Sequence, residues 1–381
     1  MLWFQNLNRR RNKHGHCFSE SVKAFAVTVY YYSPRAYNFL RSVFCLPSVS
    51  SIRDCNGSID STPGFCSAAF DHLKSYISPK PCENECCLVL DGMSIRKEST
   101  WDSNAGRFVG HVDCGGLMAS SDTLASEALV FMAVGLSGRW KLPCAFFFTN
   151  HGLSAEQQTN LVTDSGITVR AVTADGTEVN IKMFKNLGMS LDCPSFMHPC
   201  DSSVNIYGIC DAFHMLKVVR NTLVDLKILR DGDNNVIKWS YVQNLVDIQE
   251  TSGIRGANKV SVHHVNFHKH KMKVKLAAQV LSKSVADALH FLRADCNDLK
   301  QLGNEATVQF IRVVDNLFDL LNCHSPFGKG PKSALRLHNV DYWKSRLEAF
   351  CDYFLLLKSG DGISMLEHRR KTGFWGFIFK Y

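Results

Sequence analysis

Short, strand-like runs that lead into an aspartate recur between residues 86 and 225. Residues 86–90 are all apolar and lead into Asp91, and the run 168–174 leads into Asp175. Runs this short are typical of strands buried on both faces. The pattern also predicts strands over 107–113, 127–136, 145–148 and 205–210, and helices over 154–164, 178–187 and onward from Asp211. A three-strand meander followed by strand–helix alternation indicates a mixed α/β domain over 86–225.

The pattern becomes helical on the N-terminal side of that region. Val22, Phe25, Ala26 and Val29 recur at helical spacing, Pro34 starts a second helix, and a third begins near residue 47. Three short helices predict a small module over 19–60 that resembles a helix-turn-helix, although a helical spacer or dimerisation element fits nearly as well. Residues 1–18 read as a basic disordered end and 78–85 as a linker.

Residues 226–340 also read as mainly helical. Apolar periodicity predicts helices over 239–248, 272–292 and 306–322, and a further helix over 342–358. Arg312, Asp315, Asp319 and Asn322 line the polar face of the third, either as a solvated face with an internal ion pair or as a binding site. The last ten residues carry five large apolar side chains, which predicts a packing partner outside this sequence.

Composition and charge narrow the class of protein. The 381 residues carry a net charge of +8, yet residues 98–200 hold 6 Lys and Arg against 10 Asp and Glu. Basic flanks around an acidic centre fit a polyanion held outside and a cation held inside. No apolar run approaches the length of a membrane span and no secretory leader is evident, so we expect an intracellular protein. The 15 cysteines lack zinc-module spacing and predict buried free thiols.

Two side chains are candidate metal ligands from the strand pattern alone. Asp91 and Asp175 each follow a predicted buried strand, and paired carboxylates are the hard oxygen ligands that divalent cations prefer. Either residue could instead simply open a turn. His264 and His268, four residues apart, are a weaker metal pair. A basic surface facing nucleic acid, or a solvated edge, explains the surrounding His and Lys residues better.

The order of several short motifs resembles P-element transposases and their THAP-domain-containing relatives. The matching segments are DGMSIRK at 91–97, GHVDCGG at 110–116, the Trp140–Pro143 region, Asp175-Gly176 with Asn180, DAFHMLKVVRN at 211–221, GKGPKS at 328–333 and RKTGF at 370–374. The resemblance implies an α/β fold in which an RNase H-like mixed sheet is interrupted by a mainly helical insertion domain. That places the core at 86–225, the insertion at 226–340 and a further core segment at 341–381. We expect the chain to lack the family's zinc-binding THAP module ahead of these residues.

The resemblance also assigns chemistry to particular residues. It implies that Asp91 and Asp175 bind Mg²⁺ or Mn²⁺ for DNA cleavage and strand transfer. The family's third ligand, a Glu in an Asp-x-x-Glu helix, lies beyond the RKTGF segment, and this sequence ends seven residues after Phe374. We therefore expect a chain truncated at both ends whose active site is incomplete.

A nucleotide site is implied in the insertion domain. No GxxxxGK[ST] loop is present, so phosphate wrapping of that kind is excluded. Asp319 and Asn322 match the family's Asp-x-x-Asn and are the expected contacts for GTP, with Lys259 as their partner. In the segment that carries Lys259, NKVS, a serine replaces the Asp of the GTPase NKxD motif.

Three functions fit these observations. The first is a nuclear, DNA-binding, homo-oligomeric transposase derivative that cleaves weakly or not at all. The second is a domesticated nucleic-acid-binding or regulatory module without catalysis. The third is an active enzyme encoded by a longer gene.

Overall fold

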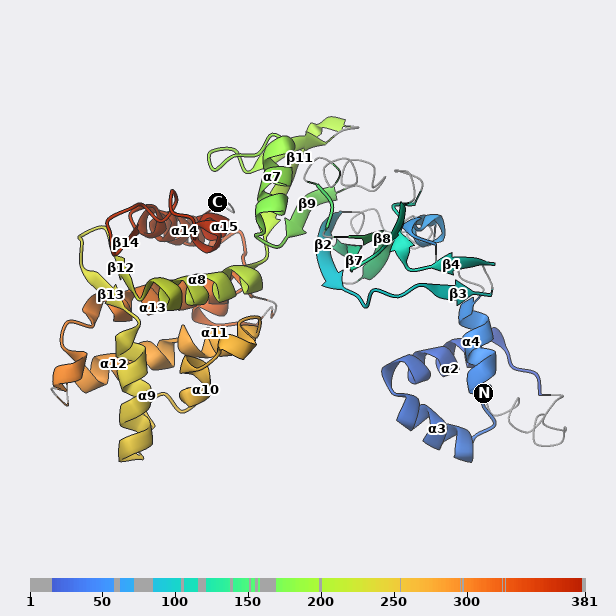
Figure 1. The fold of residues 1–381 in the computed structure, drawn as a ribbon, viewed down its shortest axis with the longest axis horizontal. Helices are drawn as coiled ribbons and strands as arrows, with labels where there is room; N and C mark the ends of the chain where they lie inside the picture. Colours follow the sequence, from blue (N-terminus) through green and yellow to red (C-terminus); the bar gives the residue numbers. More distant parts are fainter. Residues whose placement is uncertain are drawn as a thin grey trace.

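The computed structural model describes residues 16–57, 62–71, 85–103, 106–115, 121–137, 140–150, 152–154, 157, 169–198, 201–253, 255–294, 296, 298–323, 325 and 327–378. Three regions follow one another along an arch: N-terminal helices, a large sheet and a helical region (Figure 1). Most of the expected disordered N-terminus, of the linker 78–85 and of the helix 154–164 lies outside the described residues.

The N-terminal helices form a module with its own small core. They are α2 (Glu20–Tyr32), α3 (Pro34–Val43) and α4 (Val49–Gly57). Ser19 and Ser33 begin α2 and α3 because their hydroxyls accept backbone N–H groups three residues on. Tyr37 is fully buried and donates its hydroxyl hydrogen to the carbonyl of Pro47 at 2.7 Å. The predicted short helices are confirmed.

A seven-stranded mixed sheet forms the middle of the molecule. In hydrogen-bonded order its strands are β1 (Gly64–Phe65), β8 (Lys141–Thr149), β7 (Glu127–Gly135), β2 (Cys86–Ser94), β9 (Val169–Ala174), β11 (Asp201–Cys210) and β10 (Ser195–His198). β2, β7 and β8 form an antiparallel meander, whereas β9 runs parallel to both β2 and β11. Helix α7 (Glu178–Asn186) follows β9. The predicted mixed α/β fold is confirmed.

Residues 107–113, predicted as a strand, do form strands, but they are not the second strand of the meander, a position that β7 takes. The segment forms short ribbons within the β2–β7 connection. They pair β3 (Thr100–Asp102) with β4 (Arg107–Val109), and β5 (His111–Val112) with β6 (Ser121–Leu124). Trp101 and Phe108 pack edge-to-face with ring centroids 5.1 Å apart, yet both remain more than half exposed. A ribbon with no buried face cannot occupy the centre of a sheet.

Helix α8 (Ala212–Leu226) joins the sheet to the helical region. It begins directly after β11 and packs against α11, α13 and α15 (Figure 1). The helices of this region are α9 (Ser240–Ser252), α10 (Val262–Val265), α11 (Val274–Val280), α12 (Lys283–Ala294), α13 (Glu305–Leu321), α14 (Val340–Leu355) and α15 (Thr372–Ile378), with 3₁₀ turns η3 (His268–His270), η4 (Leu299–Gln301) and η5 (Gly330–Lys332). A small sheet comprises β13 (Val236–Lys238), β12 (Ile228–Arg230) and β14 (Lys358–Ser359). The predicted mainly helical character is confirmed.

The single helix predicted over 272–292 is two helices. Leu281 leaves the helical backbone with φ −91° and ψ 50°, so α11 ends there. The Ser282 hydroxyl donates to the carbonyl of Gln279, while the Ser282 carbonyl accepts the N–H groups of Val285 and Ala286 and starts α12. Serine favours this local bonding over a continuous helix. Apolar periodicity alone does not detect such a break.

The partner predicted to lie outside the sequence for the apolar C-terminal run is present in the chain for residues 372–378. α15 packs on α8 and α14, and Phe374, Trp375 and Phe377 are buried. Gly376 makes the close approach to α8, because a Cβ there would lie 2.0 Å from the sulfur of Met215. No helix among the described residues is long and apolar enough to cross a bilayer.

Candidate metal and nucleic-acid site

Asp91 and Asp175 lie side by side at one end of the sheet. β2 and β9 are parallel neighbours, and Val89 is opposite Thr173. Each aspartate lies two residues beyond that pair, so both carboxylates project to the same side of the sheet, Asp91 from within β2 and Asp175 directly after the end of β9. The sheet therefore brings together the two residues predicted to bind a metal.

The pKa of Asp91 reports on this neighbourhood. Partial burial raises the pKa of Asp91, and the negative charges of Asp175 and Asp211 raise it further. The backbone of Gly92 and the His214 side chain act in the opposite direction. A carboxylate held near other carboxylates is stabilised by a bound cation, so the electrostatics fit a divalent metal.

Asp175 is held in place by its own loop and by α7. Its Oδ1 atom accepts the backbone N–H of Thr177 at 3.1 Å and the side-chain amide of buried Asn180 at 2.6 Å. Gly176 lies close against α8, because a Cβ there would lie 2.1 Å from the terminal methyl of Met215, which would have to move. The Asp-Gly pair and Asn180 thus fix the orientation of one carboxylate.

Two further side chains at this site, Asp211 and His214, were not among the predicted ligands. The backbone N–H of Asp211 donates to the carbonyl of Ala174, and its carboxylate caps α8 by accepting the N–H groups of Phe213 and His214. His214 Nδ1 lies 3.8 Å from Asp175 Oδ2. The signal in the sequence is Asp211 itself, which follows strand 205–210 as Asp91 and Asp175 follow theirs.

His214 is poised to remain neutral. Burial lowers the pKa of His214, and the charge of Lys217 one turn along α8 adds to this, although Asp175, Asp211 and Asp91 oppose it. Within the described ranges, no group of three His, Cys, Asp or Glu side chains is arranged to hold a metal ion. The site thus offers two carboxylates of the right chemistry and no complete ligand set among the described residues.

The residues predicted to bind nucleotide lie on two elements. Asp319 is near the C-terminal end of α13, where it forms an ion pair with Lys332 at 3.3 Å, and Asn322 terminates the helix. Burial, followed by the charge of Asp319, raises the pKa of Asp315 to about 6. The predicted ion pair within this helical face is wrong, because Arg312 contacts Asp287 of α12 at 3.0 Å instead.

Lys259 lies in the loop between α9 and α10. Gln249 closes this loop: its side chain accepts the N–H of Ala257 at 2.8 Å and donates to the carbonyl of Val260 at 3.4 Å. Lys259 itself is exposed, and its side chain makes no hydrogen bond or ion pair with a residue that the structure describes. Gln249 therefore holds residues 257–260 in place, while the Lys259 side chain is exposed to solvent.

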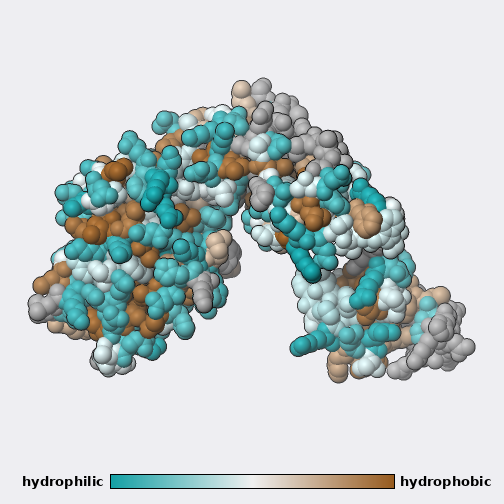
Figure 2. All heavy atoms as spheres, in the orientation of Figure 1, coloured by the Kyte–Doolittle hydropathy of each residue, from teal (hydrophilic) through white to brown (hydrophobic). Residues whose placement is uncertain are grey.

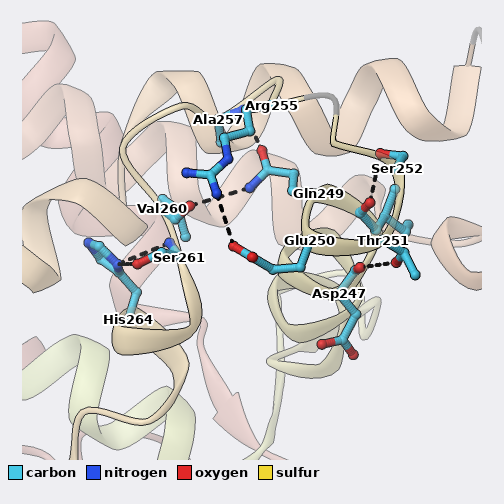
Figure 3. Close-up of polar contacts among 11 residues, drawn as sticks. Asp247, Gln249, Glu250, Thr251, Ser252, Arg255, Ala257, Val260, Ser261 and His264 are labelled. Carbon is cyan, nitrogen blue, oxygen red and sulfur yellow. Dashed lines mark hydrogen bonds and ion pairs between the residues drawn. The ribbon is translucent and has the colours of Figure 1, made fainter.

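The alternative metal pair His264 and His268 does not form a site. His264 is buried and uses both ring nitrogens: Nδ1 accepts the N–H of Ser261 at 3.1 Å and Nε2 contacts Gln279 at 3.0 Å (Figure 3 shows the Ser261 contact). His268 instead stacks on the ring of Phe267. His264 has a capping role at the start of α10.

Three transposase domain models match consecutive parts of the chain. A Transposable element P transposase-like HTH domain matches residues 3–54, a TNP-like RNase H N-terminal domain 61–188, and a TNP-like GTP-binding insertion domain 213–334. The first match supports the helix-turn-helix interpretation of α2–α4.

Two curated proteins and one solved structure resemble the chain. DNA transposase THAP9 of Homo sapiens is 30% identical over 376 residues, 95% of this chain, and the Transposable element P transposase of Drosophila melanogaster is 25% identical over 327 residues, 82% of this chain. The chain spans 41% of the length of each. A Drosophila P element transposase strand transfer complex has a TM-score of 0.79 at 22% identity, covering 99% of this chain and 81% of that one, which shows a shared fold. The three transposase domain models follow one another in order along the chain, and the chain shares the fold of the P element transposase structure. The protein therefore belongs to the P-element transposase family.

Proposed function

We propose that this protein is a P-element-type DNA transposase derivative whose core processes DNA phosphodiester bonds. The observation that carries the proposal is the Asp91–Asp175 pair, placed in register on parallel neighbouring strands. Mg²⁺ or Mn²⁺, when bound, would activate a water or 3′-hydroxyl and stabilise the leaving oxygen. Carboxylate oxygens are the donors that these ions prefer.

The residues around the pair have supporting roles in this proposal. Asn180 and the Thr177 N–H hold Oδ1 of Asp175, which leaves Oδ2 directed toward His214. A neutral His214 places no positive charge beside the carboxylates that would compete with the metal. The site therefore suits cation binding at neutral pH.

We further propose that the 381-residue chain cleaves DNA poorly by itself. The support is that the described residues hold no three-ligand group, whereas two-metal chemistry uses more carboxylates than two. The competing function is a regulatory DNA-binding module, favoured by the HTH match over residues 3–54. A weak nuclease would need Asp91 and Asp175 for its activity, whereas a regulatory DNA-binding module would not.

Mn²⁺ binding and cleavage of labelled duplex DNA test the proposal together. Asp91→Asn and Asp175→Asn should each weaken Mn²⁺ binding, while the control Asp361→Asn, at an exposed turn, should not. Wild-type cleavage with Mg²⁺ or Mn²⁺ should be weak. Robust cleavage abolished by Asp91→Asn would show a complete enzyme, and Mn²⁺ binding unaffected by both substitutions would favour the regulatory module.

We propose that the insertion domain binds guanine nucleotide, with GTP the expected ligand. The supporting observations are the domain model over 213–334 and the side chains of Asp319 and Asn322 at one end of α13. Lys259, in the loop between α9 and α10, is their proposed partner. Titration with a fluorescent GTP analogue should show weaker binding by Asp319→Ala and Lys259→Ala, and by Asn322→Ala. If all three variants bind the analogue as tightly as the wild type, the assignment is rejected.

We propose that the protein acts in the nucleus and self-associates. DNA transposase relatives support the first part. For the second, Tyr31, Tyr32 and Phe39 of the N-terminal module are largely exposed, and Figure 2 shows apolar surface on each of the three regions. Light scattering should report a dimer or larger assembly, and Tyr31→Ser with Phe39→Ser should reduce it. A monomer at all concentrations would contradict the proposal.

A further inference from the structure

A long stretch of the helical region carries only positive charge. Between Glu250 and Asp287 there are seven Lys or Arg and four His residues, and no Asp or Glu. The exposed members between residues 268 and 275 are His268, His270, Lys271, Lys273 and Lys275. Among the described residues, no carboxylate forms an ion pair with these three lysines. The surface therefore carries positive charge that no carboxylate among the described residues neutralises.

A buried arginine holds this segment against α8. Arg220 is fully buried, donates from Nη2 to the carbonyl of Lys271 at 3.0 Å, and donates from Nε to Asn221 at 2.8 Å. Its guanidinium lies 3.7 Å from the centroid of the Phe267 ring, a cation–π contact. Burying an arginine is costly, so we attribute to it the role of fixing the backbone of residues 267–271.

Arg220 also contributes charge to the same place. Its Nη1 atom is buried without a hydrogen-bond partner among the described residues, and burial lowers the pKa of Arg220 to about 10. Even so, the group stays cationic at neutral pH. A buried guanidinium without a carboxylate adds positive potential under the exposed lysines.

The segment is attached to the helix that begins at the carboxylate cluster. Asp211 and His214 lie at the start of α8, and Arg220 lies nine residues after Asp211, about 14 Å along the helix axis. Lys217 lies between them, close enough to His214 for its charge to lower the pKa of that residue. Positive groups thus follow α8 away from Asp91 and Asp175.

We propose that residues 268–275, positioned by Arg220, form a docking surface for the phosphate backbone of duplex DNA, further along α8 from the Asp91–Asp175 site. This deepens the proposed function and rests on it for the nature of the substrate. Lysine contacts to phosphates position a duplex without reading its sequence. Binding through this surface should therefore be sequence-independent and strongly salt-dependent.

Fluorescence anisotropy with a random-sequence duplex in EDTA tests the surface. The triple variant Lys271→Gln, Lys273→Gln, Lys275→Gln should bind the duplex at least about tenfold more weakly than the wild type at about 0.1 M salt. The slope of its log K against log salt should become less steep, by up to about 2.7. The control triple Lys300→Gln, Lys344→Gln, Lys358→Gln removes equal charge from exposed positions elsewhere. Equal losses in both triples, or no loss in the first, would overturn the proposal. The proposal would also be overturned if the first triple variant lost binding to anionic vesicles but bound the duplex as well as the wild type.

Arg220→Gln and Phe267→Leu test the positioning role without touching the exposed lysines. Both should weaken duplex binding and reduce the salt slope while circular dichroism shows an unchanged helix content. A folded Arg220→Gln protein that binds DNA as well as the wild type would reject that role. If the variant does not fold, the triple lysine variant still tests whether residues 268–275 bind DNA. Because EDTA removes the metal, this assay does not depend on metal binding by Asp91 and Asp175, so failure here is distinct from failure of the proposed catalytic site.

Discussion

The side-chain amide of Asn180 donates a 2.6 Å hydrogen bond to Oδ1 of Asp175. The N–H of Thr177 donates to the same oxygen, so one side of the carboxylate is held by the protein. The other oxygen, Oδ2, faces His214 at 3.8 Å. This division leaves one oxygen of Asp175 available to a ligand and fixes its direction from α7.

Asn180→Ala should weaken metal binding because it releases this carboxylate. Groups that orient a metal ligand contribute about 10- to 100-fold in affinity, so we expect a loss of that size for Mn²⁺, measured by electron paramagnetic resonance titration. Asn186→Ala, an exposed change on the same helix, is the control. Unchanged Mn²⁺ affinity in Asn180→Ala would mean that Asp175 needs no such support.

Asp91→Asn should raise the melting temperature at pH 7 in metal-free buffer. The pKa of Asp91 in the folded protein lies above its ordinary 3.8, so the charged form costs folding free energy at neutral pH. That cost disappears as the pH falls through the raised pKa and toward 3.8, and the two proteins should then converge. Scanning calorimetry across this range measures the difference.

Added Mn²⁺ should reverse the order of the two proteins. A cation neutralises the repulsion around Asp91 in the wild type, whereas Asp91→Asn has lost a ligand. If the variant melts below the wild type in EDTA at neutral pH, the repulsion between Asp91 and its neighbours is not a significant cost.

Local sequence patterns were sufficient to predict much of the fold and two of the site residues, Asp91 and Asp175. A short apolar run followed by Asp is a local feature, and it located β2, β9 and both aspartates. The apolar stripe of α13 is likewise local, since Phe310, Ile311 and Val314 recur at helical spacing and are buried.

Features that depend on distant pairing could not be predicted in the same way. Asp211 joins the carboxylate cluster only because β11 is the neighbour of β9 in the sheet. The order of strands in a sheet cannot be predicted from the sequence of any single strand. The packing of α15 on Met215 of α8 joins residues far apart in sequence. Arg312 had an acidic candidate within its own helix, yet it pairs with Asp287 because α12 packs alongside.

Gly376→Ala should destabilise the contact between α15 and α8. The added Cβ would lie 2.0 Å from the Met215 sulfur and 3.3 Å from the Cβ of Cys210, so the side chain must shift. Overpacking of this kind costs about 1–3 kcal/mol, measured by urea unfolding. Gly92→Ala, where no atom lies within 4 Å of the new Cβ, is the control. The double variant Gly376→Ala with Met215→Ala should show a favourable coupling energy, and strict additivity would contradict the contact.

Asp315→Asn should flatten the pH dependence of stability in the helical region. Burial and the charge of Asp319 raise the pKa of Asp315 from 3.8 to about 6, while the backbone N–H of Lys283 and the charges of Lys332 and Lys283 partly oppose this. Between these two values the folded protein binds a proton that the unfolded chain has lost, so the wild type loses stability as the pH rises from about 4 to about 6. The variant should lack this loss and be the more stable protein at pH 7.

Urea unfolding followed by helix content over this pH range tests the assignment, with Asp341→Asn at an exposed position of α14 as the control. Asp319→Asn provides an independent check, because removing its charge should lower the pKa of Asp315 and move the wild-type transition to lower pH. If Asp315→Asn retains the full pH dependence, another group is responsible for it. If Asp319→Asn leaves the transition in place, the two carboxylates do not interact, and the acidic end of α13 that we assign to nucleotide binding would lose its electrostatic basis.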